Sequence, residues 1–119
     1  MSTNDELAPE ALLPLSPAVF HILLALADGE KHGYAIMREV GEQTSGSMRM
    51  GPGTLYGSVQ RMLKDGLIAE VHDPAASEER RRYYCLTEFG QRVVQAEAQR
   101  LEQLVRMAQY KRILPGFGS

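Results

Sequence analysis

Apolar residues in the middle of the chain, over residues 51–66, recur at the spacing of one face of an α-helix. They stand at positions i, i+4, i+7 and i+8 and are Leu55, Val59, Met62 and Leu63. This spacing predicts an amphipathic helix with one side packed on a core. Pro52 suits its first turn, where a missing N–H costs nothing, and Gly66 suits a left-handed stop after the last turn.

The flanking patterns predict two helices before this segment and a β-hairpin after it. Apolar residues on most sides of residues 16–27 predict a buried helix, with Ser16 as its N-cap. A second helix is expected over about residues 31–44. Residues 67–72 and 80–86 have the composition of two strands separated by a polar, turn-forming stretch, which predicts the hairpin.

A long helix is predicted from Glu88 to about Ile113, with Thr87 as its N-cap. At ~1.5 Å per residue it would be roughly 39 Å long, which extends beyond a small domain. Apolar residues along it follow the 4-3-4-3 spacing of a seam between two packed helices. The seam consists of Val94, Ala98, Leu101, Val105 and Ala108, with Leu104 beside them. Since its outer half would otherwise face water, we expect a second copy of the chain to cover it.

The predicted elements divide the chain into four parts. These are a flexible N-terminal arm (1–15), a domain of three helices and a hairpin (16–87), a dimerisation helix (88–114) and a short tail (115–119). Three helices followed by a two-stranded wing is the arrangement of a winged helix-turn-helix domain. We therefore expect a mainly α fold with a β-hairpin, in which the third helix enters a DNA major groove and the wing lies against the DNA backbone.

The composition agrees with one folded domain that does not cross a membrane. The chain has 119 residues, of which 44% are hydrophobic. No apolar run approaches the ~18 residues that a membrane span needs. The single cysteine, Cys85, cannot form an intramolecular disulfide, and the N-terminus does not have the pattern of a secretory leader. We therefore expect a cytoplasmic location.

The distribution of charge matters more than the net charge of −2, which by itself argues against nucleic acid. Residues 1–30 hold five acidic residues and no Lys or Arg. The rest of the chain therefore holds 13 basic and 10 acidic residues, a net charge of +3. Any contact with DNA must then come from a local patch and not from a general basic field.

The polar face of the central helix and the segments near it supply candidate DNA contacts. Hydroxyl, amide and cationic side chains are the groups that bond phosphates and base edges. The candidates are Thr54, Tyr56, Ser58, Arg61 and Lys64 on the helix, Gly33 and Tyr34 at the start of the preceding helix, and Arg80, Arg81 and Arg82 on the wing. A helix N-terminus suits a phosphate, and Ser58 and Arg61 are the candidates for base contacts.

Several of these positions also have a plainer interpretation. The central helix could be an ordinary amphipathic surface helix, with Tyr56 as a half-buried ring on its flank. The arginine run could be solvated and offset by Glu78 and Glu79. Gly57, within the helix, costs about 1 kcal/mol relative to Ala, and close packing against backbone or phosphate would explain it.

Enzymatic and metal-binding functions find little support in the sequence. Gly51, Gly53 and Gly57 miss the spacing of a dinucleotide-binding loop, and no parallel βαβ pattern surrounds them. The histidines and Cys85 are scattered without ligand spacing, and Cys85 lies within a predicted strand. We therefore expect no catalytic residue, no metal site and no cofactor. A dimeric protein-interaction module that does not bind DNA is the alternative function.

Four short motifs follow one another along the chain. They are His32-Gly33-Tyr34, Gly53-Thr54-Leu55-Tyr56, Lys64-Asp65-Gly66-Leu67-Ile68 and Arg82-Tyr83-Tyr84-Cys85-Leu86-Thr87-Glu88-Phe89-Gly90. In order and spacing they resemble the PadR family of bacterial transcriptional regulators, and with the final helix they cover about residues 16–113. The resemblance implies a winged-helix domain, a homodimer built by the C-terminal helix and repression at a DNA operator. The single C-terminal helix is similar to the small-PadR branch, some members of which release DNA when an aromatic or drug-like molecule binds between the subunits.

Overall fold

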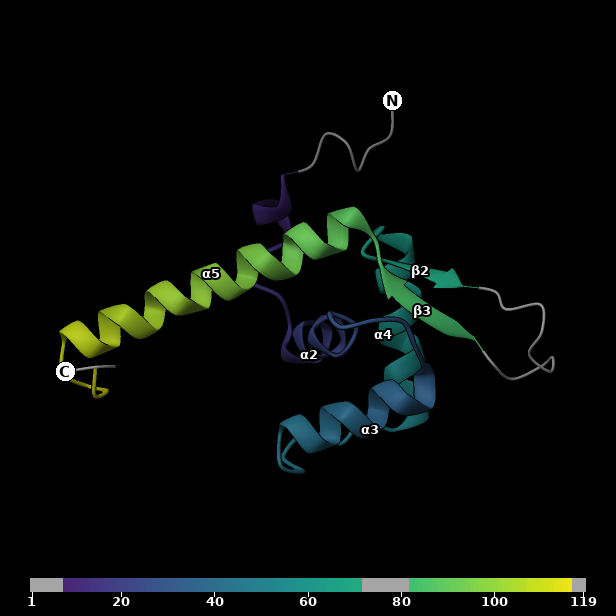
Figure 1. Ribbon diagram of the computed structural model, residues 1–119, viewed down its shortest axis with the longest axis horizontal. Coiled ribbons are helices and arrows are strands. Elements are labelled where there is room, and N and C mark those ends of the chain that lie inside the picture. Colours follow the sequence, from purple (N-terminus) through teal and green to yellow (C-terminus); the bar gives the residue numbers. More distant parts are fainter. Residues whose placement is uncertain (1–7, 72–81, 117–119) are drawn as a thin grey trace.

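The computed structural model describes residues 8–71 and 82–116, in which helices and a small sheet pack around the first part of a long C-terminal helix (Figure 1). The elements in chain order are the 3-10 helix η1 (Pro9–Leu12), α2 (Pro17–Ala25), β1 (Lys31–His32), α3 (Gly33–Gln43), α4 (Pro52–Lys64), β2 (Ile68–Val71), β3 (Tyr83–Leu86) and α5 (Glu88–Tyr110). The described elements therefore have the mainly α winged-helix arrangement that the hydrophobic pattern predicts.

The helix starts follow the capping residues in the sequence. Ser16 accepts a hydrogen bond from the backbone N–H of Val19 at 3.2 Å, and Pro17 occupies the first turn of α2. Thr87 caps α5 in the same way, because its hydroxyl oxygen accepts from the N–H of Gly90 at 2.9 Å. These bonds satisfy backbone donors that a helix end otherwise leaves without a partner.

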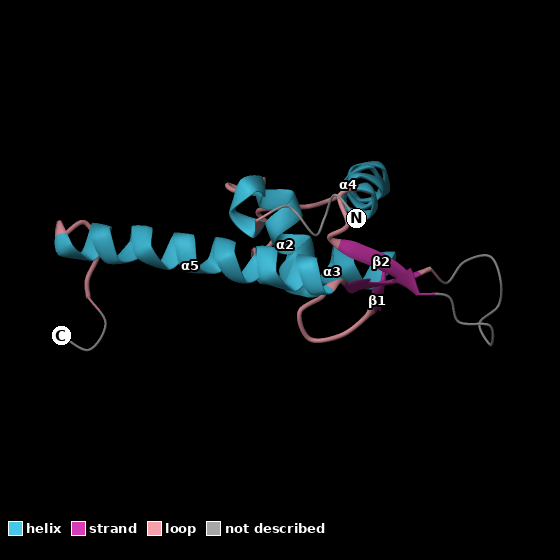
Figure 2. Ribbon diagram, turned by 90° about the horizontal axis from the view of Figure 1, so that it is seen from above, coloured by secondary structure: helices cyan, strands magenta, loops and turns pink. Residues whose placement is uncertain are grey.

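The sheet has one strand more than we expected. Lys31 and His32 form β1, which pairs antiparallel with β3, and the strand order within the described residues is β1-β3-β2. We expected these two residues to open the second helix. His32 instead has an extended backbone and caps α3, since its Nδ1 accepts from the N–H of Ala35 at 3.3 Å. Figure 2 shows the sheet at one end of α5, away from the C-terminus of the chain.

The core lies between α2, α3, α4, the sheet and the first half of α5. Its members with no exposed surface include Ile22, Leu23, Ile36, Val40, Leu55 and Val93. The predicted apolar face of α4 is buried there, with Leu63 only partly covered at its edge. Burial of one face leaves the other face of α4 toward solvent.

The second half of α5 projects beyond this core (Figure 1). The helix ends at Tyr110, somewhat before the expected end at Ile113, and Arg112 has a left-handed backbone with φ 65°. Large apolar side chains are exposed along this part. The exposed fraction is 44% for Leu104 and 84% for Tyr110. The described part of the chain therefore leaves most of the large apolar side chains of this half in water.

The described part of the N-terminal arm, residues 8–15, packs against the rest of the fold, and its flexibility stays a prediction. The 3-10 helix η1 packs against α5, and Leu12, Leu13 and Leu15 pack on the core. The N–H of Leu15 donates to Glu97 Oε2 at 2.9 Å. The sequence did not reveal this packing, because it depends on contacts of three leucines with the core and on a carboxylate 82 residues away.

Glu97 is the one buried charged residue within the described ranges, with 2% of its surface exposed. Arg100 donates to both carboxylate oxygens, through Nε to Oε1 at 2.5 Å and through a terminal nitrogen to Oε2 at 3.1 Å. The Arg100 guanidinium holds the pKa of Glu97 below its usual range, against the opposing effect of burial. The carboxylate therefore stays charged at neutral pH and joins the arm to α5.

A compact junction connects the end of α4 to the start of α5. The Thr87 hydroxyl lies 2.6 Å from the carbonyl oxygen of Gly66 and 3.1 Å from that of Leu67. Gly66 has the left-handed φ of 78° that its position after α4 predicted. A Cβ on Gly90 would lie 1.9 Å from the Leu67 carbonyl oxygen, so only glycine allows α5 to approach this turn.

Glu97→Ala should lower the free energy of unfolding by about 2 kcal/mol, because it leaves the Leu15 N–H and the Arg100 guanidinium without their shared acceptor. Chemical denaturation measures this change. Since the folded-state pKa of Glu97 is lowered, its contribution is present at neutral pH and is lost as the pH falls through that pKa. Glu102→Ala is the control, because Glu102 also pairs with an arginine, Arg106, but is exposed. Equal effects of the two substitutions would contradict the assigned role of Glu97.

Candidate nucleic-acid interface

The solvent face of α4 carries most of the predicted contact residues. Thr54, Tyr56, Arg61 and Lys64 are exposed, and Ser58 is half-buried. Arg61 and Lys64 lie in the last turn of the helix, where positive charge is favourable beside the negative end of the helix dipole. Neither forms an ion pair with another described residue, so both cations are free to meet an anionic partner.

A hollow of about 240 Å³ runs beside this face, between α4 and the first turn of α2. Its lining is Ser16, Val19, Gly53, Thr54, Gly57, Ser58 and Arg61. The sequence pointed to Ser16 only as a helix cap and to Val19 only as an apolar residue. Their position beside α4 depends on how α2 crosses it, which no local pattern in the sequence specifies.

Gly57 has no packing reason within the described chain. A Cβ built on it would meet no heavy atom within 4 Å outside the backbone of its own helix, so the described chain leaves room for a methyl group there. This excludes one of the two explanations that we considered for a glycine inside a helix, namely close packing against the described backbone. Close approach of a partner such as a phosphate backbone remains as the other explanation.

Gly33 and Tyr56 are coupled at the start of α3. Gly33 is buried, and a Cβ on it would lie 2.6 Å from the Tyr56 hydroxyl oxygen. The glycine thus allows the Tyr56 ring to lie over the first turn of α3. Tyr34, the next residue, is 62% exposed, and the Arg38 guanidinium lies 5.9 Å from its ring centroid. A phosphate contact at Gly33 and Tyr34 stays a prediction.

At the base of the wing, Arg82 lies 3.5 Å from Glu70, and both side chains are largely exposed. Tyr84 is buried beneath them, and burial raises the pKa of its phenol. The predicted contacts Arg80 and Arg81 lie outside the described residues. An exposed ion pair is weak, so Arg82 can exchange Glu70 for a phosphate at little cost.

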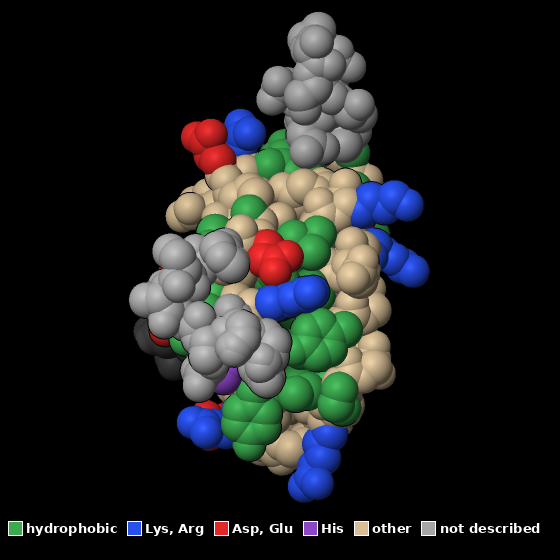
Figure 3. All heavy atoms as spheres, turned by 90° about the vertical axis from the view of Figure 1, so that its right-hand side faces the viewer, with side chains coloured by type: hydrophobic (Ala, Val, Ile, Leu, Met, Phe, Trp, Pro, Cys, Tyr) green, Lys and Arg blue, Asp and Glu red, His purple; other side chains and the backbone are tan. Residues whose placement is uncertain are grey.

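Figure 3 views the molecule from the side of the wing and α4. Hydrophobic side chains gather on this face, and Lys and Arg side chains lie around them. Tyr34 and Tyr56 are among the exposed large hydrophobic residues of the described chain. Aromatic and cationic groups together suit an anionic polymer with flat or apolar sugar and base surfaces.

The predicted dimer seam divides into two parts. Val94, 8% exposed, belongs to the core of its own chain. The remaining residues lie further along α5, where Ala98, Leu104 and Val105 are exposed and Leu101 and Ala108 are half-buried. The surface open to a second chain therefore begins after Val94.

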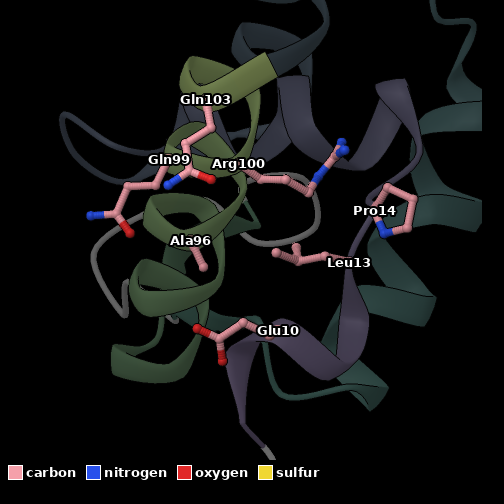
Figure 4. A pocket seen from close by; sticks show the side chains of 7 residues that line it. All are labelled: Glu10, Leu13, Pro14, Ala96, Gln99, Arg100 and Gln103. Atoms are coloured by element: carbon pink, nitrogen blue, oxygen red, sulfur yellow. The ribbon is translucent and has the colours of Figure 1, made fainter. Parts of the chain in front are cut away.

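A second hollow, of about 380 Å³, lies between the η1 segment and α5 (Figure 4). Figure 4 shows Arg100 reaching from α5 toward Pro14, with Gln99 and Gln103 on the other side. The Arg100 guanidinium is already bound to Glu97. The hollow therefore belongs to the contact that holds the arm, and it lies within one chain.

The described residues hold no group of three or more His, Cys, Asp or Glu side chains placed to bind a metal ion. Cys85 lies within β3, opposite Ala69, and is half-buried. Among the helices of residues 8–71 and 82–116, none is long and apolar enough to cross a membrane.

The three helices, the antiparallel sheet with its wing and the exposed polar face of α4 define a winged-helix protein. The chain belongs to the PadR-like family of transcriptional regulators, whose family model matches residues 22–96. It is similar to Transcriptional regulator Rv3488 of Mycobacterium tuberculosis, with 35% identity over 89 residues that cover 72% of this chain and 77% of that protein.

Another relative is an uncharacterised 37.1 kDa protein in transposon TN4556 of Streptomyces fradiae, with 41% identity over 83 residues. These residues are 70% of this chain but only 22% of that protein, so the chain spans about a fifth of the length of this relative. Among solved structures, Bacillus subtilis PadR in complex with operator DNA is similar with a TM-score of 0.60 and 22% identity. The match covers 74% of this chain and 48% of that one, and at this identity it concerns the fold.

Gly57→Ala should stabilise the fold and weaken DNA binding together. Alanine is favoured over glycine inside a helix by about 1 kcal/mol, and the structure has room for the added methyl group. The same methyl group would separate α4 from a closely approaching partner. Thermal unfolding and fluorescence anisotropy with labelled duplex DNA measure the two effects. Gln95→Ala, on an exposed position of α5 and away from the polar face of α4, is the control. A more stable variant with unchanged DNA affinity would show that nothing approaches Gly57 closely.

Proposed function

We propose that the chain is a homodimeric, sequence-specific DNA-binding repressor. The observation that carries the proposal is the solvent face of α4, where short hydroxyl side chains stand beside Arg61 and Lys64, neither of them paired with a described residue. Membership of a family of transcriptional regulators and the operator-bound state of Bacillus subtilis PadR support it. In this proposal α4 enters the major groove and the wing lies along the phosphate backbone.

The exposed apolar half of α5 supports the dimer. Two copies joined along Leu101, Leu104 and Val105 would cover side chains that a single chain leaves in water. Dimer symmetry would then present two α4 helices to successive major grooves about 34 Å apart, on a pseudo-palindromic operator. A small molecule that releases the DNA would bind between the subunits, in keeping with the family resemblance.

Titration of wild-type protein against duplex DNA at several salt concentrations tests the proposal. The duplex is obtained by selection from a random library with the wild-type protein. Displacement of counterions from the phosphates predicts a steep linear fall of log K with log salt concentration. The alternative, a dimeric module that binds another protein through the same faces, predicts no selected sequence and no DNA affinity. Absence of binding at low salt would therefore reject the DNA-binding function.

Arg61→Ala should cost about 1–3 kcal/mol of binding free energy on the selected duplex and relax the preference at one base position per half-site. The reason is that a guanidinium can make two hydrogen bonds to a guanine edge. Competition with duplexes that carry each base at each position measures this. Equal weakening on every sequence would make Arg61 a phosphate contact instead.

Leu101→Asp should convert the dimer to monomer, because the seam would have to bury an unpaired carboxylate. Analytical ultracentrifugation measures the mass. Gln99→Asp introduces the same charge on an exposed position of α5 and should leave the dimer intact. A Leu101→Asp protein that sediments as a dimer would place the interface elsewhere.

A further inference from the structure

A separate groove lies on the side of α4 away from the wing strands. Figure 1 shows α4 between α3 and the strands β2 and β3. The groove is a shallow, open depression of about 380 Å³ where α3, the link between α3 and α4, and the start of α4 meet. Its lining includes Tyr34, Met37, Arg38, Arg49, Met50 and Pro52, and we call it the Arg38/Arg49 groove.

The two arginines give the groove a positive charge that no acidic side chain in its lining offsets. Both are exposed, and neither forms an ion pair with a residue in the described ranges. On the same helix, the Glu39 carboxylate already has two partners. Its Oε1 lies 3.5 Å from Lys31 Nζ, and its Oε2 accepts a hydrogen bond from Gln43 Nε2 at 3.0 Å. The charge of the groove is therefore available to an anionic partner.

The floor and wall of the groove are apolar. Met37 and Met50 are wholly or partly buried beneath it, and Pro52 is the first residue of α4. The Arg38 guanidinium lies 5.9 Å from the centroid of the exposed Tyr34 ring, within the range of a cation–π contact. Arg49 lies over the turn at Gly46, with its Nη2 3.9 Å from where a Cβ on that glycine would be.

We propose that the Arg38/Arg49 groove binds the sugar–phosphate backbone of one DNA strand, opposite the strand that the wing contacts. The inference rests on the proposed DNA-binding function and extends it to two residues outside the predicted interface. Arginines at the rim suit phosphate oxygens, and the apolar floor suits the deoxyribose rings between them. The groove adjoins the predicted interface, because its lining includes the predicted contact Tyr34 and the first residue of α4, Pro52.

The double variant Arg38→Ala/Arg49→Ala tests the groove, with affinity measured by fluorescence anisotropy over a salt series. We expect the selected duplex and a random duplex to bind roughly ten-fold more weakly, by similar factors. The slope of log K against log salt should fall by about two units, one for each phosphate contact. Thermal stability and dimer mass should not change, because both residues are exposed.

Two further variants sharpen this test. Arg92→Ala/Arg106→Ala removes the same charge from exposed positions on α5, outside the groove, and should retain the wild-type affinity and slope. Arg38→Lys/Arg49→Lys keeps the charge and should keep most of the salt slope. Comparison of these two proteins with the Arg38→Ala/Arg49→Ala protein distinguishes a local contact with DNA from a general effect of net charge.

Each other result would overturn the inference. Wild-type affinity and slope in the Arg38→Ala/Arg49→Ala protein would show that the groove does not touch DNA and is open to a different partner, such as an acidic peptide. An equal loss of DNA affinity in the Arg92→Ala/Arg106→Ala protein would show that the net charge of the protein, and not the groove, accounts for the weaker binding. If the double variant bound only the selected duplex more weakly, and the slope of log K against log salt did not change, the two arginines would contact bases and not phosphates. Wild-type protein that binds no DNA would instead reject the proposed function itself.

Discussion

The junction between α4 and α5 is the constraint on which the rest of the arrangement depends. The Thr87 hydroxyl bonds the turn after α4 while it also caps α5, and Gly90 lets the helix approach the Leu67 carbonyl. The direction of α5 relative to α4 is therefore set by short contacts to the backbone of the turn, which the Thr87 hydroxyl and Gly90 make. If α5 joins two chains, as we propose, the same contacts set the separation and tilt of the two α4 helices. In that dimer, a small change in how the α5 helices pair would be transmitted to the proposed DNA-contacting face.

The proposed interface would allow a chain with a net charge of −2 to bind a polyanion. The cations that remain unpaired among the described residues of this face are on α4, on α3 and in the link between them. Glu39 is instead paired with Lys31, and Glu97 with Arg100. Arg82 is the intermediate case, since its exposed pair with Glu70 is weak enough to be exchanged. Local pairing, and not the total charge, decides which positive groups are available to a partner.

The two halves of the long C-terminal helix differ in what covers their apolar side chains. Its first half completes the core of the winged-helix domain through Phe89, Val93 and Val94, and it also holds the N-terminal arm through Glu97. Its second half leaves apolar side chains in water. One regular apolar spacing runs through both halves, which is why the sequence suggested a single seam that included Val94. Where the core ends and the open surface begins depends on how far the other helices extend alongside α5.

Periodicity and capping residues determined much of this protein from the sequence alone. The buried face of α4, the caps at Ser16 and Thr87 and the left-handed Gly66 all depend on neighbours within a few residues, so local patterns predict them. The sequence patterns did not predict the two-residue strand β1 or the packing of the arm at residues 8–15. The pairing of His32 with Tyr83 and the bond from Leu15 to Glu97 join residues far apart in the chain. The same holds for the grooves beside α4, which bring Ser16 to Arg61 and Arg38 to Arg49. Only the tertiary structure decided these features, because contacts between distant segments leave no periodic signal in the sequence.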